Sequence, residues 1–233
     1  PGRAFHPIVL ENGSRPDEAG LLEAGLPGSA TLLASDANLG FAAGVNAAAA
    51  YGSADWILLL NPDLVPGEGV LGSLLSRLPA APAHGILGAV RLGDGPRSYG
   101  EFPGLLDRFR APSRVSSTGA PQQVDWVSGC FMAIRRSLFA SLGGFDEGFF
   151  MQLEDVDLCW RALGAGFVTL VDPRLTFEHP GHLSYVRSGR DLGRDYHHAR
   201  TRLLTRHRGR VVGWAYRILS GLSAMARTPR RGP

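Results

Sequence analysis

The sequence predicts an α/β protein with a mostly parallel sheet flanked by helices. Short apolar segments typical of strands alternate along the chain with segments whose apolar residues have helical spacing. One segment, Trp56–Leu60, is a continuous apolar run, which is expected for a strand buried on both faces. Alternation of this kind favours parallel strands joined by right-handed crossovers through helices.

The composition is that of a globular protein with one sizeable hydrophobic core. The chain has 233 residues, 44% of them hydrophobic, and a mean hydropathy of −0.01. No apolar run approaches the ~20 residues that a membrane-spanning helix needs. The two cysteines, Cys130 and Cys159, lie in apolar segments without metal-ligand spacing, so we expect reduced core residues and a cytoplasmic location.

The charge divides the chain into two parts. Residues 1–186 have 12 Arg against 19 acidic residues, whereas residues 187–233 have 12 Arg against only two. We therefore expect one domain over 1–186 and a basic helical tail over 187–233. The tail could be a solvated helix face, or it could make peripheral contact with an anionic membrane through an apolar side. That side would comprise Trp214, Ile218, Leu219 and Leu222. Binding to nucleic acid is disfavoured, because no recognised module accompanies the arginines.

The remaining elements follow from apolar spacing and from turn residues. In the first part of the chain we expect strands at 8–10, 30–34, 56–60 and 86–92, and helices at 17–24, 40–51 and 68–78. Residues 93–123, rich in Gly, Pro, Ser and Arg, predict a long loop. After it we expect strands at 124–127, 130–134, 167–171 and 175–178, a helix from about 154, and one or two helices from 190 to a disordered end at 228–233.

The segment 143–161 looks like the organising element of the chain. A glycine pair, Gly143 and Gly144, can end the helix before it. In the new helix, the apolar residues at helical spacing predict a buried stripe made of Val156, Cys159, Trp160 and Leu163.

Charged residues of that helix suggest two kinds of role. Glu154 and Asp155 fall in the first turn, where the helix dipole favours negative charge. Asp157 and Arg161 are four residues apart and are expected to pair on the helix surface. Two carboxylates at a helix start can be capping residues alone, so the pattern by itself leaves a catalytic role open.

Two further segments have the composition of ligand-binding loops. Asn61-Pro62-Asp63 directly follows strand 56–60, where open α/β sheets bind their ligands. It could be a simple turn, or Asp63 could hold a divalent cation that binds a diphosphate. The glycine-rich segment 38–46 resembles a phosphate-binding loop, although its spacing matches neither the dinucleotide fingerprint nor the P-loop.

Together these motifs resemble the family-2 glycosyltransferases of the GT-A (Rossmann-like) fold, particularly their bacterial rhamnosyltransferase-like branch. The matching segments are 38–46 (NLGFAAGVN), 58–63 (LLLNPD), 127–132 (VSGCFM) and 143–161. The resemblance extends from about Ile8 to Arg208 and implies a GT-A sheet with a C-terminal helical tail. It also implies an inverting glycosyltransferase that moves a sugar from a nucleotide-diphosphate donor to a cell-surface glycan or a lipid-linked acceptor.

The resemblance assigns the reaction to a few side chains. Asp155 would be the general base that takes the proton of the acceptor hydroxyl, and Glu154 would orient the acceptor or the base. Asp63 would bind a divalent metal, Mn or Mg, that bridges the nucleotide diphosphate. His179 would be a further metal ligand, or a strand-end histidine bonded to a backbone carbonyl.

The remaining roles concern the two substrates. The residues expected to contact the nucleotide-sugar are Glu11, Asn12, Ser14, Asn38, Gly40, Gly44, Asn46 and Asn61. Those expected at the acceptor are Ser128, Gly129 and Trp126. Trp126 and Trp160 could stack on sugar rings, although Trp160 lies on the predicted apolar stripe and fits the core better.

One departure from the family concerns the N-terminal strand. The chain starts at what resembles the second strand of the family, so we expect a neighbouring strand to lack a partner. The alternative function is therefore an inactive nucleotide- or glycan-binding remnant of the family. A nucleotide-dependent oxidoreductase is disfavoured, because no acidic ribose-binding residue follows the glycine motif at the expected spacing.

Overall fold

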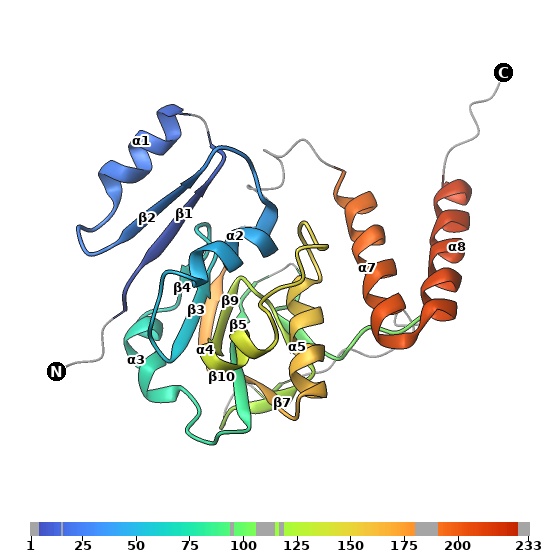
Figure 1. Cartoon of the computed structure of the whole chain (residues 1–233). Helices are drawn as coiled ribbons and strands as arrows, with labels where there is room; N and C mark the ends of the chain where they lie inside the picture. The colour runs from blue at the N-terminus through green and yellow to red at the C-terminus, as the bar shows by residue number, and fades with distance from the viewer. Residues whose placement is uncertain are drawn as a thin grey trace.

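The computed structural model describes residues 5–14, 16–93, 96–105, 115–116, 119–179 and 191–227. Figure 1 shows a central sheet with helices packed around it and two long helices, α7 and α8, at one side. The predicted disordered end at 228–233, the predicted boundary after residue 186 and the side chain of Leu222 lie outside the described part of the chain.

The N-terminal elements precede the main sheet in the chain, and α2 packs against its core. They are β1 (Ile8–Asn12), α1 (Pro16–Gly25), β2 (Thr31–Ser35) and α2 (Gly40–Ala49), close to the predicted positions. The strands β1 and β2 pair in parallel as a two-stranded sheet that is separate from the main one. Within the described residues, β1 pairs only with β2.

The main sheet is mixed and has the strand order β3-β9-β5-β10-β4, with β7 also paired to β10. Its strands are β3 (Trp56–Leu60), β4 (Val65–Pro66), β5 (His84–Arg91), β7 (Gln122–Val124), β9 (Phe131–Arg135) and β10 (Val168–Glu178). The three long strands β3, β5 and β10 share a direction, and β9 runs in the opposite direction between β3 and β5. The strands predicted at 167–171 and 175–178 form a single strand, with a register shift between Asp172 and Thr176. Two shorter strands, β6 (Tyr99–Gly100) and β8 (Trp126–Val127), pair with each other inside the predicted long loop and just after it.

The prediction that Trp56–Leu60 is buried on both faces was wrong. Burial alternates along β3: Ile57 and Leu59 are 9% and 8% exposed, whereas Leu60 is 40% exposed. Trp56 and Leu58, on the other face of the strand, are half-buried against the second apolar cluster, so that face is only partly covered. Among the described strands, β3 is at the end of the strand order and pairs with β9 alone.

The hydrophobic core is divided between the two faces of the sheet. Because side chains alternate along a strand, Ile86 joins one apolar cluster and Leu87 the other. One face packs against α4 (Arg136–Ser141) and α5 (Glu154–Gly164), and the other packs against α3 (Val70–Arg77). Both cysteines are free, as predicted, and burial raises the pKa of Cys159 to about 12.

The glycine pair and the new helix are confirmed. Gly143 and Gly144 have φ of 73° and 74°, and their N–H groups bond to carbonyls of α4, which ends at Ser141. The prediction of a buried stripe on α5 was wrong at one position, because Leu163 is 47% exposed. Asp157 was expected at the surface but is fully buried. Asp157 lies on the buried side of α5, because α7 packs against that side.

The C-terminal helices are α7 (Leu192–Arg208) and α8 (Arg210–Arg227). The Asp191 side chain accepts hydrogen bonds from the first N–H groups of α7, and Gly209, with φ of 94°, separates the helices. Leu203 and Leu204 of α7 are fully buried, and Leu203 belongs to the core, so a purely solvated face was wrong for this helix. Among the described helices, none is long and apolar enough to cross a membrane.

Candidate active site

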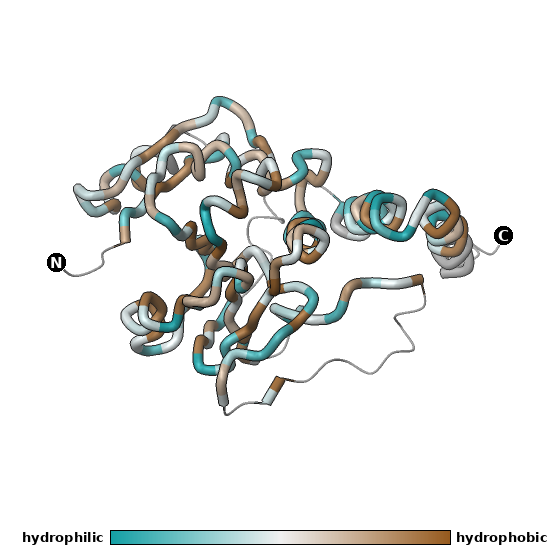
Figure 2. Tube along the Cα trace, turned by 60° about the horizontal axis from the view of Figure 1, so that its bottom comes forward, coloured by the Kyte–Doolittle hydropathy of each residue, from teal (hydrophilic) through white to brown (hydrophobic). Residues whose placement is uncertain are grey.

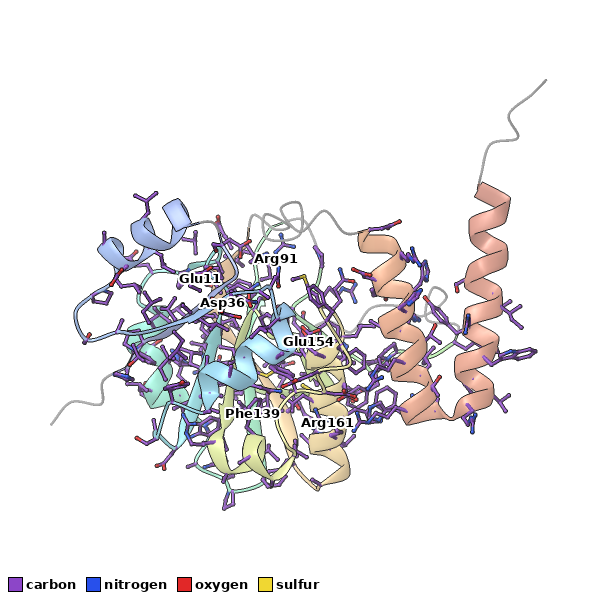
Figure 3. All side chains as sticks on the ribbon, turned by 45° about the horizontal axis from the view of Figure 1, so that its top comes forward. Glu11, Asp36, Arg91, Phe139, Glu154 and Arg161 are labelled. Atoms are coloured by element: carbon purple, nitrogen blue, oxygen red, sulfur yellow. The ribbon has the colours of Figure 1, made fainter. Side chains whose placement is uncertain are left out.

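Several polar side chains meet at one edge of the main sheet. The parallel strands β3, β5 and β10 end at this edge, and β9 begins there because Leu60 pairs with Phe131. The residues that follow or precede these strand ends include Asn61, Asp63, Gly129 and His179. In Figure 3, Glu11, Arg91 and Glu154 lie toward the same side of the molecule, while Arg161 lies farther away. Ligand binding at the carboxyl ends of strands is the rule for open α/β sheets.

Asp63 and His179 face each other, although they are far apart in the sequence. Asp63 Oδ1 lies 2.9 Å from His179 Nε2, and the Asn61 side-chain nitrogen lies 3.4 Å from the same ring atom. Asp63 Oδ1 is buried, and apart from this contact with His179 it has no hydrogen-bond partner among the described residues. A carboxylate oxygen and an imidazole nitrogen that converge in this way suit a divalent cation. No cluster of three or more His, Cys, Asp or Glu ligands occurs in the part of the chain that is described.

Arg91 at the end of β5 supports His179, and the sequence analysis missed it. Its guanidinium donates to the His179 carbonyl at 2.5 Å and to the Pro96 carbonyl at 3.2 Å. Its backbone N–H donates to the buried Ser98 hydroxyl. Arg91 thus ties the end of β10 to the end of β5. Its place at a strand end, like that of Asp63, was the signal that could have identified it.

Asp155 is held between the acceptor segment and its own helix. Its Oδ2 accepts the Gly129 N–H at 2.9 Å, and its Oδ1 accepts the Val156 N–H at 2.8 Å. Burial raises the pKa of this carboxyl, and the two backbone N–H groups and the Ser128 hydroxyl oppose that rise. Asp155 therefore has a fixed orientation. The structure brings Ser128, Gly129 and Asp155 together.

Glu154, the first residue of α5, has a different environment. The residue is 5% exposed, and its Oε2 is buried without a hydrogen-bond partner among the described residues. Burial, and then the neighbouring Asp155, raise the pKa of Glu154 well above its ordinary value. Because two adjacent buried carboxylates resist losing both protons, Glu154 keeps its proton more readily than an exposed glutamate does.

The glycine-rich loop 38–41 is tied to β1 on one side and to the segment before α5 on the other. Asn12 accepts the Leu39 N–H at 2.9 Å and donates to the Gly40 carbonyl at 3.1 Å. The Phe41 N–H donates to the Phe150 carbonyl at 2.8 Å. Gly40 has φ of 82°, and a Cβ there would lie 2.4 Å from the Phe150 oxygen, so only glycine fits. Asn38 closes the loop by accepting the Gly40 N–H at 2.9 Å.

Glu11 and Ser14 form a local turn at the end of β1. The Ser14 N–H donates to Glu11 Oε1, and hydrogen bonds from Ser14 lower the pKa of Glu11. Between them, Gly13 has φ of 77° and packs against the backbone of Ala37 and Asn38. The turn therefore lies beside the glycine-rich loop, as the resemblance implied for the nucleotide side of the site.

The backbone before α5 is strained. Gln152 and Leu153 have φ of 75° and 66°, a conformation that non-glycine residues seldom adopt. Each such residue costs about 1–3 kcal/mol, and such residues concentrate at functional sites. The strain lies between Phe150, which accepts the Phe41 N–H, and Glu154.

Four other predicted residues have side chains or surroundings that serve packing. The Asn46 amide bonds to the Phe145 backbone and to Glu147 at 2.9 Å. Gly44 packs against Leu10 and Asn12. The Trp126 indole lies against Gly100 and donates to the Glu101 carbonyl at 2.9 Å. The two ring faces of Trp160 are covered by Phe102 and His207, with centroid distances of 4.2 and 4.4 Å.

Comparison with known proteins identifies the family. The model described as "Glycosyl transferase family 2" matches residues 1–143, more than half of the chain. The chain belongs to glycosyl transferase family 2. Within that family it falls in a rhamnosyltransferase-like branch, as the next comparisons show.

Curated relatives of this family 2 chain include two rhamnosyltransferases. It is 33% identical over 177 residues to N-acetylglucosaminyl-diphospho-decaprenol L-rhamnosyltransferase of Mycobacterium tuberculosis, covering 64% of this chain and 58% of the relative. It is 34% identical over 126 residues to Rhamnosyltransferase WbbL of Escherichia coli, covering 48% and 47%. The chain thus spans about half to three fifths of the length of these relatives.

Solved structures of glycosyltransferases share the fold. GalNAc-T7 with UDP, GalNAc and Mn²⁺ superposes with a TM-score of 0.58 at 14% identity, over 74% of this chain and 37% of that one. The mannosyltransferase PcManGT from Pyrobaculum calidifontis, in complex with GDP-Man and Mn²⁺, gives 0.56 at 16% identity, over 95% and 66%. The family 2 chain therefore has the GT-A fold predicted from its sequence.

Proposed function

We propose that this chain is an inverting glycosyltransferase, which moves a sugar from a nucleotide-diphosphate donor to an acceptor hydroxyl. The observation that supports it most is the setting of Asp155. This half-buried carboxylate is oriented by the Gly129 and Val156 N–H groups at the sheet edge where Asp63 and His179 meet. A base and a cation site at one edge are the two parts that such a transfer needs.

In the proposed reaction, Asp155 takes the proton of the acceptor hydroxyl as that oxygen attacks the anomeric carbon. The new bond joins the acceptor oxygen to the sugar, and the bond from the sugar to the diphosphate oxygen breaks. The electron pair leaves with the diphosphate. Because attack occurs opposite the leaving group, the configuration inverts and no covalent enzyme intermediate forms. The raised pKa of Asp155 makes it a stronger base than an exposed aspartate.

Asp63 and His179 would hold a divalent metal, Mn or Mg, beside the donor diphosphate. When bound, such an ion stabilises the negative charge of the departing diphosphate. The buried Asp63 Oδ1 fits this role, because His179 Nε2 at 2.9 Å is its one polar contact among the described residues and a bound cation would add a partner. Arg91 would keep His179 in place through its carbonyl.

The donor would lie along the loop formed by residues 38–41 and the turn at 11–14. Asn12 and Asn38 would act mainly by shaping the glycine-rich loop, since their side chains already bond to it. Glu154, in its protonated form, would orient the acceptor or Asp155. GalNAc-T7 and PcManGT are complexes with UDP and with GDP-Man, so a nucleotide diphosphate is a plain choice of probe.

The acceptor is proposed to be a glycan or a lipid-linked glycan. The relative from M. tuberculosis is named for an acceptor on a decaprenol diphosphate, which is a membrane lipid. We infer that the chain acts in the cytoplasm, in peripheral contact with the inner leaflet of the cell membrane, where such an acceptor would be reached.

Titration calorimetry with UDP, dTDP and GDP, each with and without manganese, tests the proposal. We expect one nucleotide to bind only when the metal is present, and Asp63→Ala to weaken that binding. Manganese dependence that persists unchanged in Asp63→Ala would refute the ligand role.

Transfer assays with the Asp155→Asn variant test the base. We expect turnover to fall by about 10²-fold or more while nucleotide affinity stays near that of the wild type. Asp55→Asn is the control, because Asp55 is an exposed carboxylate just before β3, at the end of the strand far from Asp63. Equal loss of turnover and nucleotide binding would mean that Asp155 is structural. Absence of nucleotide binding in the wild type would favour a remnant that binds glycan alone.

A further inference from the structure

The exposed apolar residues of the molecule are concentrated on α8. In the part of the chain whose side chains are described, twelve large hydrophobic residues are exposed: eight are scattered between Phe5 and Leu163, and four fall within nine residues of this helix. Val211, Trp214, Ile218 and Leu219 are 79%, 67%, 40% and 48% exposed. Figure 2 shows hydrophobic segments on α8, next to the C-terminus, as well as in the strands of the core. Apolar side chains gathered in one exposed place mark an interaction surface.

Three of these residues form a ridge on the side of α8 that faces away from α7. We name this set, Val211, Trp214 and Ile218, the apolar ridge. Its members recur every three or four residues, so they lie on one side of the helix at about 100° per residue. Figure 1 shows α8 on the outer side of α7, away from the sheet.

The opposite side of α8 packs against α7 through small and polar residues. Gly213 is buried against Thr205, and a Cβ there would lie 2.0 Å from the Thr205 hydroxyl oxygen. The Tyr216 hydroxyl lies 2.7 Å from His197 Nδ1. Gly213 and Tyr216 are roughly opposite the ridge when placed at about 100° per residue. The helix is therefore oriented with its polar side inward and its apolar side in water, the reverse of an ordinary surface helix.

The charge beside the ridge identifies what it fits. From Tyr196 to Arg227 there are seven arginines and no Asp or Glu. Arg202 and Arg206 are engaged with Asp146, whereas Arg210 and Arg217 are exposed and form no ion pair within the described residues. These two arginines are seven residues apart and lie next to Trp214 around the helix axis.

We propose that the apolar ridge of α8 inserts into the surface of an anionic bilayer, with Arg210 and Arg217 at the lipid phosphates. Apolar side chains on one side of a helix, a tryptophan among them and arginines alongside, have the pattern of interfacial helices. A second copy of the chain fits less well, because a ridge-to-ridge contact would bring two sets of unpaired arginines together. The inference deepens the proposed function by naming the surface that meets the membrane, but it rests on α8 and not on the transfer reaction.

Vesicle co-sedimentation of the full chain tests this inference without any nucleotide. We expect binding to vesicles that contain phosphatidylglycerol and little binding to pure phosphatidylcholine vesicles. The double variant Val211→Ser/Ile218→Ser should bind about tenfold more weakly or worse. Leu21→Ser is the matched control, since Leu21 is 76% exposed but lies on α1, and it should bind like the wild type.

Two further measurements separate the contribution of the apolar ridge to membrane binding from that of the arginines. Trp214 is the one tryptophan that is exposed in the part of the chain described, so its emission should shift to shorter wavelength on vesicle binding. The variant Arg210→Gln/Arg217→Gln should lose most of the preference for anionic lipid, because each arginine near such a surface adds roughly fivefold to affinity.

Several outcomes would overturn the inference. They are equal binding to both kinds of vesicle, unchanged binding by the ridge variant, and a ridge-dependent dimer in sedimentation velocity without vesicle binding. The outcome is independent of catalysis. A chain that binds vesicles but no nucleotide would support the membrane surface and contradict the proposed transferase activity. A chain that binds nucleotide but no vesicles would support the transferase activity and contradict the membrane surface.

Discussion

The two C-terminal helices are adjacent, similar in length and rich in arginine, yet they are used in opposite ways. In α7 basic side chains pair with acids of neighbouring elements: His207 and Arg206 approach the buried Asp157 at 2.8 and 3.5 Å, and Arg202 and Arg206 bind the half-buried Asp146. In α8, Arg210 and Arg217 form no ion pair within the described residues, and the apolar ridge is in water. The comparison teaches that arginine content alone does not define a helix as surface or core. Whether an arginine-rich helix packs inward depends on the carboxylates that neighbouring elements present to it.

Asp157 should have the largest effect on stability. It is fully buried, and burial by itself would raise its pKa, but hydrogen bonds from His207 and Arg161 lower the pKa on balance. Asp157→Asn removes the buried carboxylate that Arg161 and His207 contact, which costs about 3–5 kcal/mol. Urea unfolding measures this. Asp146→Asn, at a 17% exposed side chain, should cost less. An equal or larger loss at Asp146 would contradict the inward role assigned to Asp157.

The same cluster predicts a dependence on pH. Because the pKa of Asp157 is lowered in the folded state, its contribution to stability is present above the ordinary carboxyl pKa of about 4. That contribution is lost as the pH falls through the lowered value. The stability difference between the wild type and Asp157→Asn should therefore narrow below pH ~4. Unfolding curves at several pH values would show it, and a difference that stays constant with pH would exclude an ionised Asp157.

Truncation of one leucine in α7 and one isoleucine in α8 compares the helices directly. Leu203 is fully buried in the core, so Leu203→Ala should cost about 2–5 kcal/mol. Ile218 is 40% exposed, and Ile218→Ala should change stability by less than about 0.5 kcal/mol. Thermal or urea unfolding of the two variants measures both. A large loss from Ile218→Ala would mean that the ridge is packed against protein.

Glycine substitutions in α8 should give small effects of opposite sign. Gly213→Ala places a methyl group 2.0 Å from the Thr205 hydroxyl oxygen, and the overpacking should outweigh the gain in helix propensity by about 1 kcal/mol. At Gly221 nothing lies within 4 Å, so Gly221→Ala should stabilise by up to about 1 kcal/mol. Differential scanning calorimetry would resolve the signs. The same sign for both would argue against close packing of α7 and α8.

The sequence was sufficient wherever a local pattern determined the structure. The glycine pair before α5, the first-turn position of Glu154 and Asp155, and the Asp157–Arg161 pair follow from spacing, and the structure has all of them. The burial of Asp157 does not, because it depends on His207, which is 50 residues away. The partial exposure of one face of β3 likewise depends on which elements pack against it, and the apolar content of the strand does not encode that.

At the candidate site, the sequence indicated which residue types lie at strand ends, but it did not indicate which of these side chains contact one another. The meeting of Asp63 with His179 could be expected only through the resemblance, and Arg91 was overlooked although it ends a strand. The catalytic, metal-binding and substrate-contacting roles remain predictions, which the proposed assays address. Asn46 illustrates the limit most clearly, because its amide is bound by a backbone segment 99 residues away.

That long separation has a consequence for how the protein folds. The site is closed by contacts across 99 residues, from Asn46 to Phe145, and across 118 residues, from Asn61 to His179. The hairpin of α7 and α8 is joined across 19 residues, from His197 to Tyr216. Since distant contacts form slowly and local ones quickly, the helical hairpin should fold early and the site should be completed last. A newly made chain would thus present α8 before the candidate site is complete.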